Sequence, residues 1–285
     1  MSLNYDGLMS ARRTQTVHYS DRETMLYALG IGMGADPMNE AELKYVYEKK
    51  LVTVPTMASI LVDTFDLGIL EDNGVNAQLT LHGEERLTLH QPLPPAADVI
   101  CDLRMKEVFD KGKDKGALIL LEAEVRLESG AVLFTIERST FARGNGGFGG
   151  RKDGAPEPQV IPSRQPDTLF TLSTQPDQAL LYRLSGDRNP LHADPAFARG
   201  AGFEKPILQG LCTYGTACRA VLSAVCDYDQ TRIKSFDVRF SAPVTPGDVL
   251  LTEIWDEGSY LVFRTKVRES GAVVLNNGRC NLARG

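Results

Sequence analysis

Apolar residues recur along this chain with two spacings, and each spacing predicts a different element. Over residues 207–226 they return every three or four positions, which is typical of an amphipathic helix. Residues 55–70 form a second apolar, helix-like segment. Shorter apolar runs separated by Gly-bearing turns predict strands. These runs cover residues 87–89, 99–105, 117–127, 133–141, 233–240, 249–255, 261–267 and 273–282.

A glycine-rich stretch, residues 143–158, separates the two sets of strands and holds six of the 26 glycines of the chain. Such a composition predicts a linker or a long loop. It divides the 285 residues into an N-terminal unit, 1–142, and a C-terminal unit, 159–285. In each unit a helix-like segment precedes several strands, so we predict an α+β fold with a long helix wrapped by an antiparallel sheet in each half.

The two halves also resemble each other in sequence, which indicates an internal duplication. VRLESGAVL at 125–133 returns as VRESGAVVL at 267–275, and FARG at 141–144 returns as LARG at 282–285. Two further pairs occur upstream: PLPPAAD at 92–98 with PVTPGD at 243–248, and YAL at 27–29 with YRL at 182–184. All four matches follow the same order in both halves.

Composition excludes several classes of function. The net charge is −6 and the pI is about 5.4, so no basic field favours nucleic acid or an anionic membrane. No apolar run approaches the ~20 residues of a membrane-spanning helix, and the N-terminus has no secretory pattern. The five cysteines are scattered without a C-x-x-C pair, which favours a reducing compartment. We therefore expect a cytoplasmic protein.

Candidate chemistry lies in the segment SGDRNPLH at 185–192, which predicts a short loop after a helix. Asp187 and His192 are a suitable acid/base pair, and Asn189 can hydrogen-bond either of them or a bound water. An alternative reading makes Asp187 and Asn189 ordinary turn residues and His192 a surface partner. The duplication favours the catalytic reading, because the first copy has no histidine between His18 and His82.

The stretch YRLSGDRNPLH at 182–192, followed by GFEKPILQGLC at 202–212, resembles the motif of (R)-specific 2-enoyl-CoA hydratases, or hydratase 2 enzymes. These belong to the MaoC-like hot-dog superfamily. LHGEERLTLHQPL at 81–93, GGFGG at 146–150 and RFSAPVTPG at 239–247 extend the likeness to the two-hot-dog form, which also occurs as the hydratase domain of peroxisomal multifunctional enzyme type 2. The resemblance implies a double hot-dog fold.

This resemblance implies a reaction and its residues. Asp187 and His192 match the pair that activates a water for addition to a trans-2-enoyl-CoA, which yields a (3R)-hydroxyacyl-CoA. Asn189 matches a supporting residue, and Gly210 matches the residue whose backbone N–H forms the oxyanion hole. The CoA thioester is the substrate, and no metal or redox cofactor is implied. Relatives with two hot dogs in one chain commonly form homodimers.

The resemblance also assigns an acyl-CoA site to His82, Gly83, Lys111 and Phe240. Taken alone, His82 reads as a half-buried histidine and Lys111 as part of a solvated charge run, although a lysine can also bind CoA phosphates. The first half, which lacks the catalytic residues, is expected to bind the acyl chain.

Two other functions remain compatible with the sequence. A hot-dog acyl-CoA thioesterase would attack the carbonyl carbon rather than C3 and release free CoA. A non-catalytic acyl-CoA-binding module would have no need for the acid/base pair.

Overall fold

The structure is a computed structural model that describes residues 3–62, 66–76 and 79–283. The first half contains five short helices and five strands within the described residues. Its elements are α1 (Tyr5–Ser10), β1 (Arg12–Tyr19), α2 (Asp21–Gly30), α3 (Glu40–Val46), the 3-10 helix η1 (Pro55–Leu61), α4 (Asp66–Asp72), β2 (Thr80–Leu89), β3 (Ala97–Asp110), β4 (Ala117–Leu127) and β5 (Val132–Ala142).

The second half repeats this plan with one long helix. Its elements are β6 (Thr168–Ser173), α5 (Gln178–Tyr182), the 3-10 helices η3 (Arg183–Ser185) and η4 (Pro190–His192), α6 (Pro195–Gly200), α7 (Gly210–Ala224), the 3-10 helix η5 (Gln230–Arg232), β7 (Ser235–Phe240), β8 (Val249–Asp256), β9 (Tyr260–Val267) and β10 (Val273–Asn281).

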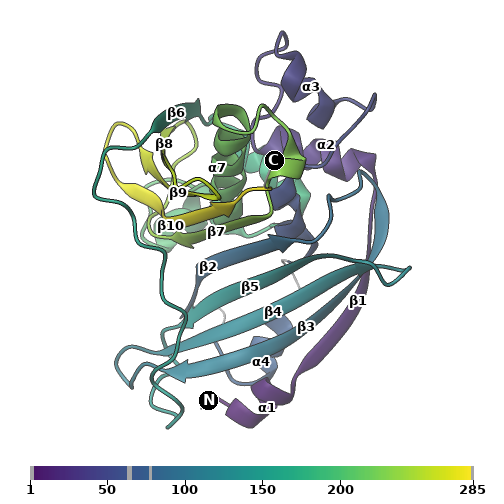
Figure 1. Ribbon diagram of the computed structural model, residues 1–285. Coiled ribbons are helices and arrows are strands. Elements are labelled where there is room, and N and C mark those ends of the chain that lie inside the picture. The colour runs from purple at the N-terminus through teal and green to yellow at the C-terminus, as the bar shows by residue number, and fades with distance from the viewer. Residues whose placement is uncertain (1–2, 63–65, 77–78, 284–285) are drawn as a thin grey trace.

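One antiparallel sheet of ten strands runs through the described chain in the order β1-β3-β4-β5-β2-β7-β10-β9-β8-β6. The two halves meet where β2 pairs with β7, and the register places Glu84 opposite Arg239 and Leu87 opposite Phe236. Figure 1 shows α7 behind the strands of the second half, with α2 and α3 of the first half beside it. The predicted α+β class is confirmed. The boundaries at residues 142 and 158 stay a prediction.

The apolar pattern located most of the strands but not the sheet edges. All eight predicted runs overlap observed strands, although β2 begins at Thr80 rather than at residue 87. The two edge strands, β1 and β6, were not predicted. β1 reads RRTQTVHY and is mostly exposed, so it lacks the apolar alternation that marks a half-buried strand.

The predicted helix of the second half is confirmed as α7, whereas a long helix in the first half is wrong. Pro55–Leu61 forms a 3-10 helix, and α4 follows at Asp66–Asp72, with residues 63–65 outside the described part. Nearly every residue of Pro55–Leu61 is buried. The apolar residues in this segment therefore indicated that it is buried, but they did not indicate which type of helix it forms. Its hydroxyl and β-branched residues are weak helix formers, and tertiary packing decides the conformation.

Small residues allow α7 to pack directly against the first half. A Cβ placed on Gly215 would lie 2.5 Å from Ile31 Cγ2 and 2.7 Å from the Tyr27 hydroxyl oxygen. That hydroxyl donates a hydrogen bond to Thr56 Oγ1 at 3.0 Å, so it has little freedom to move aside. Further along α7, Arg219 forms a buried ion pair with Glu42 of α3 at 2.8 Å.

The glycine-rich segment forms an irregular loop that packs against the β3–β4 hairpin. The carboxylate of Asp110, at the end of β3, accepts hydrogen bonds from the backbone N–H groups of Gly147 and Gly149, each at 2.8 Å. A Cβ on Gly146 would lie 2.0 Å from the carbonyl oxygen of Gly112. Glycine therefore occurs here because two backbone segments approach closely.

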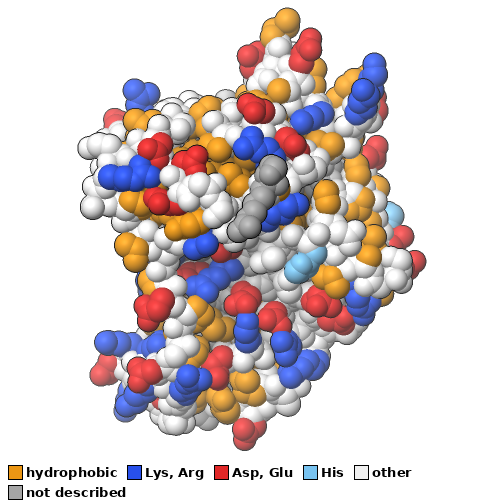
Figure 2. Space-filling model, in the orientation of Figure 1, with side chains coloured by type: hydrophobic (Ala, Val, Ile, Leu, Met, Phe, Trp, Pro, Cys, Tyr) orange, Lys and Arg blue, Asp and Glu red, His pale blue; other side chains and the backbone are white. Residues whose placement is uncertain are grey.

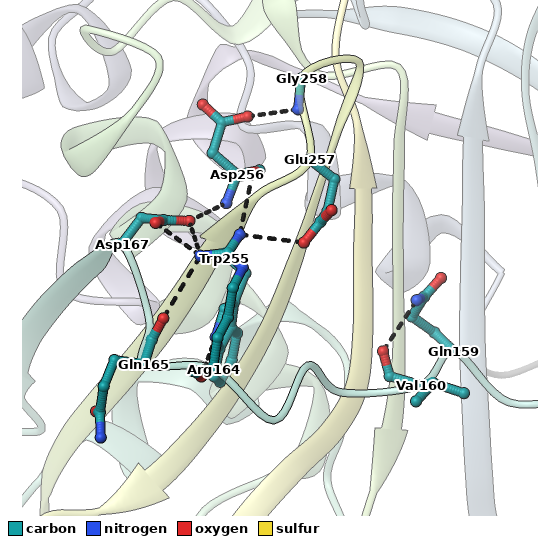
Figure 3. Close-up of polar contacts among 9 residues, drawn as sticks. All are labelled: Gln159, Val160, Arg164, Gln165, Asp167, Trp255, Asp256, Glu257 and Gly258. Carbon is teal, nitrogen blue, oxygen red and sulfur yellow. Dashed lines mark hydrogen bonds and ion pairs between the residues drawn. The ribbon is translucent and has the colours of Figure 1, made fainter.

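The chain then crosses to the second half and is held at the edge of its sheet (Figure 3). Arg164 pairs with Asp167 at 2.7 Å and with Glu257 at 3.1 Å. The Trp255 indole N–H donates to the backbone carbonyl of Arg164 at 2.9 Å. These bonds join the start of β6 to the β8–β9 turn.

Charged side chains of both signs are interspersed on the face of the sheet seen in Figure 2. At the junction of the halves, the sheet register places Asp237 of β7 between Arg86 of β2 and Arg279 of β10. These three residues line a cavity of about 410 Å³ on the surface. Burial raises the pKa of Asp237 to about 7, although both arginines act in the opposite direction.

Within the described residues, no helix is long and apolar enough to cross a membrane. All five cysteines are free and buried. Burial raises the pKa of the Cys101, Cys212 and Cys218 thiols to about 12, so they are poor nucleophiles near neutral pH.

The Gly215→Ala substitution is expected to lower the free energy of unfolding by about 1–3 kcal/mol, because the added methyl group overpacks the contact with Ile31 and Tyr27. Urea unfolding measures the change. Gly200→Ala is the matched control, because a Cβ on this helical glycine meets no atom within 4 Å. Equal stability of the two variants would contradict the packing described for α7.

The Asp237→Asn substitution is expected to change how stability depends on pH. Because the folded-state pKa of Asp237 lies near 7 and the unfolded value near ~3.9, the folded protein binds more protons in between, and wild-type stability falls as pH rises through this window. The variant should therefore gain on the order of 1–3 kcal/mol relative to wild type between pH 4 and 8. Urea unfolding at several pH values across this range measures the change, with Glu269→Gln at an exposed position as the control. A difference in the free energy of unfolding between variant and wild type that does not change with pH would contradict the prediction.

Candidate active site

The loop with the predicted acid/base pair connects two short 3-10 helices. η3 ends at Ser185, and Gly186 follows with φ of +131°, a conformation that favours glycine. Asp187 comes next, and η4 begins at Pro190 and ends at His192. The loop brings the side chains of Asp187 and His192 within 3.4 Å of each other.

His192 is buried and its orientation is set by one hydrogen bond. Its Nδ1 lies 2.8 Å from the backbone carbonyl oxygen of Ile207. A carbonyl can only accept, so Nδ1 carries the proton and donates it. In the neutral imidazole, Nε2 then has a free lone pair, and this atom lies 3.4 Å from Asp187 Oδ2. Two hydrogen-bond acceptors thus face one another.

Asn189 supports this arrangement through the backbone of the loop. Its own N–H donates to Asp187 Oδ1 at 3.0 Å, and its side-chain oxygen accepts from the N–H of Leu191 at 3.0 Å. The first bond holds the Asp187 carboxylate, and the second caps the 3-10 helix that carries His192.

Gly210 is the first residue of α7 and is exposed. The first N–H groups of a helix have no acceptor within it and lie at the positive end of the helix dipole. The segment just before Gly210 also orients His192, because the Ile207 carbonyl accepts the hydrogen bond from His192 Nδ1. Gln209 ties it to α5, because its side-chain amide donates to the carbonyl of Ala179 at 3.0 Å.

Phe240 and His82 extend the site across the junction of the halves. A Cβ on Gly210 would lie 3.3 Å from the Phe240 ring, so the ring packs on the start of α7. The His82 ring, from the first half, lies with its centroid 4.5 Å from that of Phe240. Gly210, the predicted oxyanion donor, thus contacts Phe240, and Phe240 contacts His82, both of which are predicted acyl-CoA residues. We call these three residues the contact chain.

Gly83 lies at a β-bulge, where the pairing of β2 with β5 shifts between His82 and Glu84. A Cβ there would lie 2.6 Å from Ser139 Oγ. The extra residue changes the alternation of faces, so that His82 and Glu85, three positions apart, point to the same side. Gly83 accordingly has a structural role next to the predicted site.

Two charged residues beneath His82 were not singled out from the sequence. Glu85 is fully buried and its Oε2 lies 3.0 Å from His82 Nε2. Arg138 of β5, also buried, donates to both Glu85 oxygens at 2.9 and 3.2 Å. Burial alone would raise the pKa of Glu85, but the charge of Arg138 and the hydrogen bond from His82 outweigh it and lower the pKa to about 2. The carboxylate is therefore charged at neutral pH.

Lys111 lies in the turn of the β3–β4 hairpin. Its ammonium group donates to the backbone carbonyl of Lys152 at 2.9 Å and lies 5.1 Å above the ring centroid of Phe109. These contacts belong to the hairpin and the glycine-rich loop. They do not join Lys111 to the contact chain of His82, Phe240 and Gly210.

The match of YAL at 27–29 with YRL at 182–184 sets an offset of 155 residues, which places Gly32 and Gly34 opposite Asp187 and Asn189. These two glycines have a different use. Gly32 has a positive φ of +87°, and a Cβ on it would lie 2.9 Å from the Arg219 guanidinium. Gly34, with φ of +76°, donates its N–H to Glu42 at 2.8 Å. This turn therefore packs on the buried Glu42–Arg219 pair instead of presenting acid/base groups.

Within residues 3–62, 66–76 and 79–283, no group of three or more His, Cys, Asp or Glu side chains could hold a metal ion.

Comparison with known families matches both halves of the chain. Residues 17–144 match the MFE-2 hydratase 2 N-terminal domain, and residues 158–277 match the MaoC like domain. Enoyl-CoA hydratase ChsH3 of Mycobacterium tuberculosis is 41% identical over 86% of this chain and 86% of its own length. Mouse peroxisomal multifunctional enzyme type 2 is 41% identical over 93% of this chain, which spans 36% of that larger protein.

Solved structures agree with these matches. A MaoC-like dehydratase from Phytophthora capsici superposes with a TM-score of 0.87 at 33% identity, over 98% of this chain and 99% of that one. A Mycobacterium tuberculosis protein described as a double hot dog superposes over 98% of this chain and 97% of its own with a TM-score of 0.57 at 13% identity, which bears on the fold alone. The predicted double hot-dog fold is confirmed.

Proposed function

We propose that this chain, which belongs to the MaoC-like dehydratase family and its hydratase 2 group, reversibly hydrates trans-2-enoyl-CoA to (3R)-hydroxyacyl-CoA with Asp187 and His192 as the groups that activate water. Membership of the family makes the chain a hydro-lyase that acts on enoyl-CoA. The roles of individual residues and the stereochemistry of the product are the proposal.

One observation supports this assignment above all others: His192 Nε2 and Asp187 Oδ2 are two acceptors only 3.4 Å apart. A water to one side of both atoms, ~2.8 Å from each, would donate one proton to each and direct its oxygen lone pairs away from both. It is then oriented as a nucleophile before the substrate arrives. In the proposed step, the water oxygen bonds to C3 while a proton passes to His192 Nε2. The Asp187–His192 pair returns a proton to C2.

The electrons of the C2=C3 bond move toward the thioester oxygen as the water attacks. An N–H donor fixed in place before the reaction stabilises this developing charge. We assign the donor to the backbone N–H of Gly210, where the dipole of α7 adds to the effect. Phe240 of the second half and His82 of the first half then line the site beside Gly210. Lys111 remains a candidate for the CoA phosphates, and a homodimer and a cytoplasmic location stay predictions.

The Asp187→Asn and His192→Gln substitutions are each expected to lower the hydration rate of crotonyl-CoA by at least about 100-fold, because a carboxamide in either place can accept a hydrogen bond but cannot take up and return a proton. The assay follows loss of the enoyl absorbance, and chiral analysis of the product tests for the (3R) alcohol. Asp194→Asn is the control, because Asp194 lies on the same segment and its carboxylate caps α6.

Near-wild-type rates for both variants, with the control also unchanged, would show that the chemistry lies elsewhere. A thiol reagent distinguishes the thioesterase alternative in the same reaction, since hydration leaves the thioester intact and releases no free CoA.

The chain is expected to hydrate medium-chain enoyl-CoA thioesters in addition to crotonyl-CoA. The first half has short elements over Pro55–Leu61 and Asp66–Asp72 in place of the long helix that fills the second half. We propose that the acyl chain extends into this half. The measurement is kcat/KM against chain length, and activity confined to four-carbon substrates would contradict a channel there.

A further inference from the structure

We propose that Glu85 and Arg138 are positioning residues for acyl-CoA binding: the buried pair holds the His82 ring against Phe240, whose own ring packs on Gly210. This inference rests on the proposed function and adds two residues to which the family resemblance assigns no role.

The burial of the pair is the first argument. The Glu85 side chain is 0% exposed and that of Arg138 is 4% exposed. Burying two charges is costly, and well-packed apolar residues in their place are often neutral or stabilising. A buried ion pair is therefore weak evidence for a stabilising role, which leaves the orientation of a neighbouring group as its use.

The position of His82 is the second argument. One nitrogen, Nε2, lies 3.0 Å from Glu85 Oε2, so the carboxylate selects a ring with a proton on that atom. The ring is then fixed at two points, by this bond and by its contact with Phe240 at 4.5 Å between centroids. About a quarter of the His82 side chain stays accessible, at 27% exposed.

The β-bulge at Gly83 is the third argument, because it is what allows the pair to reach His82. In a regular strand, residues three positions apart point to opposite faces. The shift of pairing between His82 and Glu84 places His82 above the buried carboxylate, and Ser139 leaves no room for a side chain at Gly83. The bulge at Gly83, the Glu85–Arg138 ion pair and the His82–Phe240 ring contact together fix the position of His82 at the junction of the halves.

The test replaces the pair by Glu85→Met with Arg138→Met, which removes both charges at once and leaves neither unpaired. KM for crotonyl-CoA is expected to rise about tenfold, since a lost hydrogen bond to a charged group permits the ring to leave its place. The kcat is expected to stay within about twofold of wild type, because Asp187, His192 and Gly210 are untouched.

A double-mutant cycle with His82→Ala separates positioning from a structural role. His82→Ala alone should raise KM by a similar factor, and the methionine pair should add no further rise in that background. The matched control is Glu42→Met with Arg219→Met on α3 and α7. This ion pair has 2% and 9% side-chain exposure, and its shortest N···O distance is 2.8 Å, compared with 2.9 Å for Glu85–Arg138. It should leave KM unchanged.

An unchanged KM, an equal rise in the His82→Ala background, or an equal rise in the control would overturn the proposal. If the variant with both methionines does not fold, Glu85→Gln alone tests the proposal. We then expect KM to rise about threefold or more, and an unchanged KM would contradict the proposal. These results are distinguishable from a failure of the proposed function, because that would appear as unaffected turnover in the Asp187→Asn and His192→Gln enzymes.

Discussion

The carboxylate of Glu85 lies in the interior where the two halves of the sheet join, and it is charged because Arg138 and His82 surround it. A lone carboxylate in this position would take up a proton or unfold the surrounding structure. Several other features serve this interaction. The pairing of β2 with β5 brings Arg138 opposite Glu85, the bulge at Gly83 turns His82 toward it, and the pairing of β2 with β7 brings Phe240 into reach of the His82 ring.

The second half orients its reactive groups by a different means. No buried charge is required near His192, because a backbone carbonyl, that of Ile207, receives its Nδ1 proton. The segment that supplies this carbonyl continues directly into α7. The proposed base, His192, is consequently hydrogen-bonded to the segment that begins α7, and a shift of this segment would move both His192 and the helix N-terminus. Such coupling suits a reaction in which water attack and charge development occur on neighbouring atoms of the substrate.

The duplicated halves have diverged in what they bury. The second half keeps the long helix α7, whereas the first half has η1 and α4 and adds α3, whose Glu42 pairs with Arg219 of α7. The turn of the first copy that corresponds to the catalytic loop contains Gly32 and Gly34, and both contact the buried Glu42–Arg219 pair. The first copy therefore has a structural use for the positions at which the second copy carries acid/base residues.

The sequence by itself determined the α+β plan, the interior strands and the helix α7, and it located the candidate catalytic loop, because these depend on local periodicity and on a motif of adjacent residues. It did not reveal the edge strand β1, whose exposed side chains give no alternation, or the 3-10 helix at Pro55–Leu61, whose uniform burial resembles that of a helix. Only the tertiary structure decided that Glu85 and Arg138 belong with His82. They lie 53 residues apart, and a one-residue bulge determines which face of β2 carries the histidine. Strand pairing is a long-range property, so no local pattern could place the three side chains together.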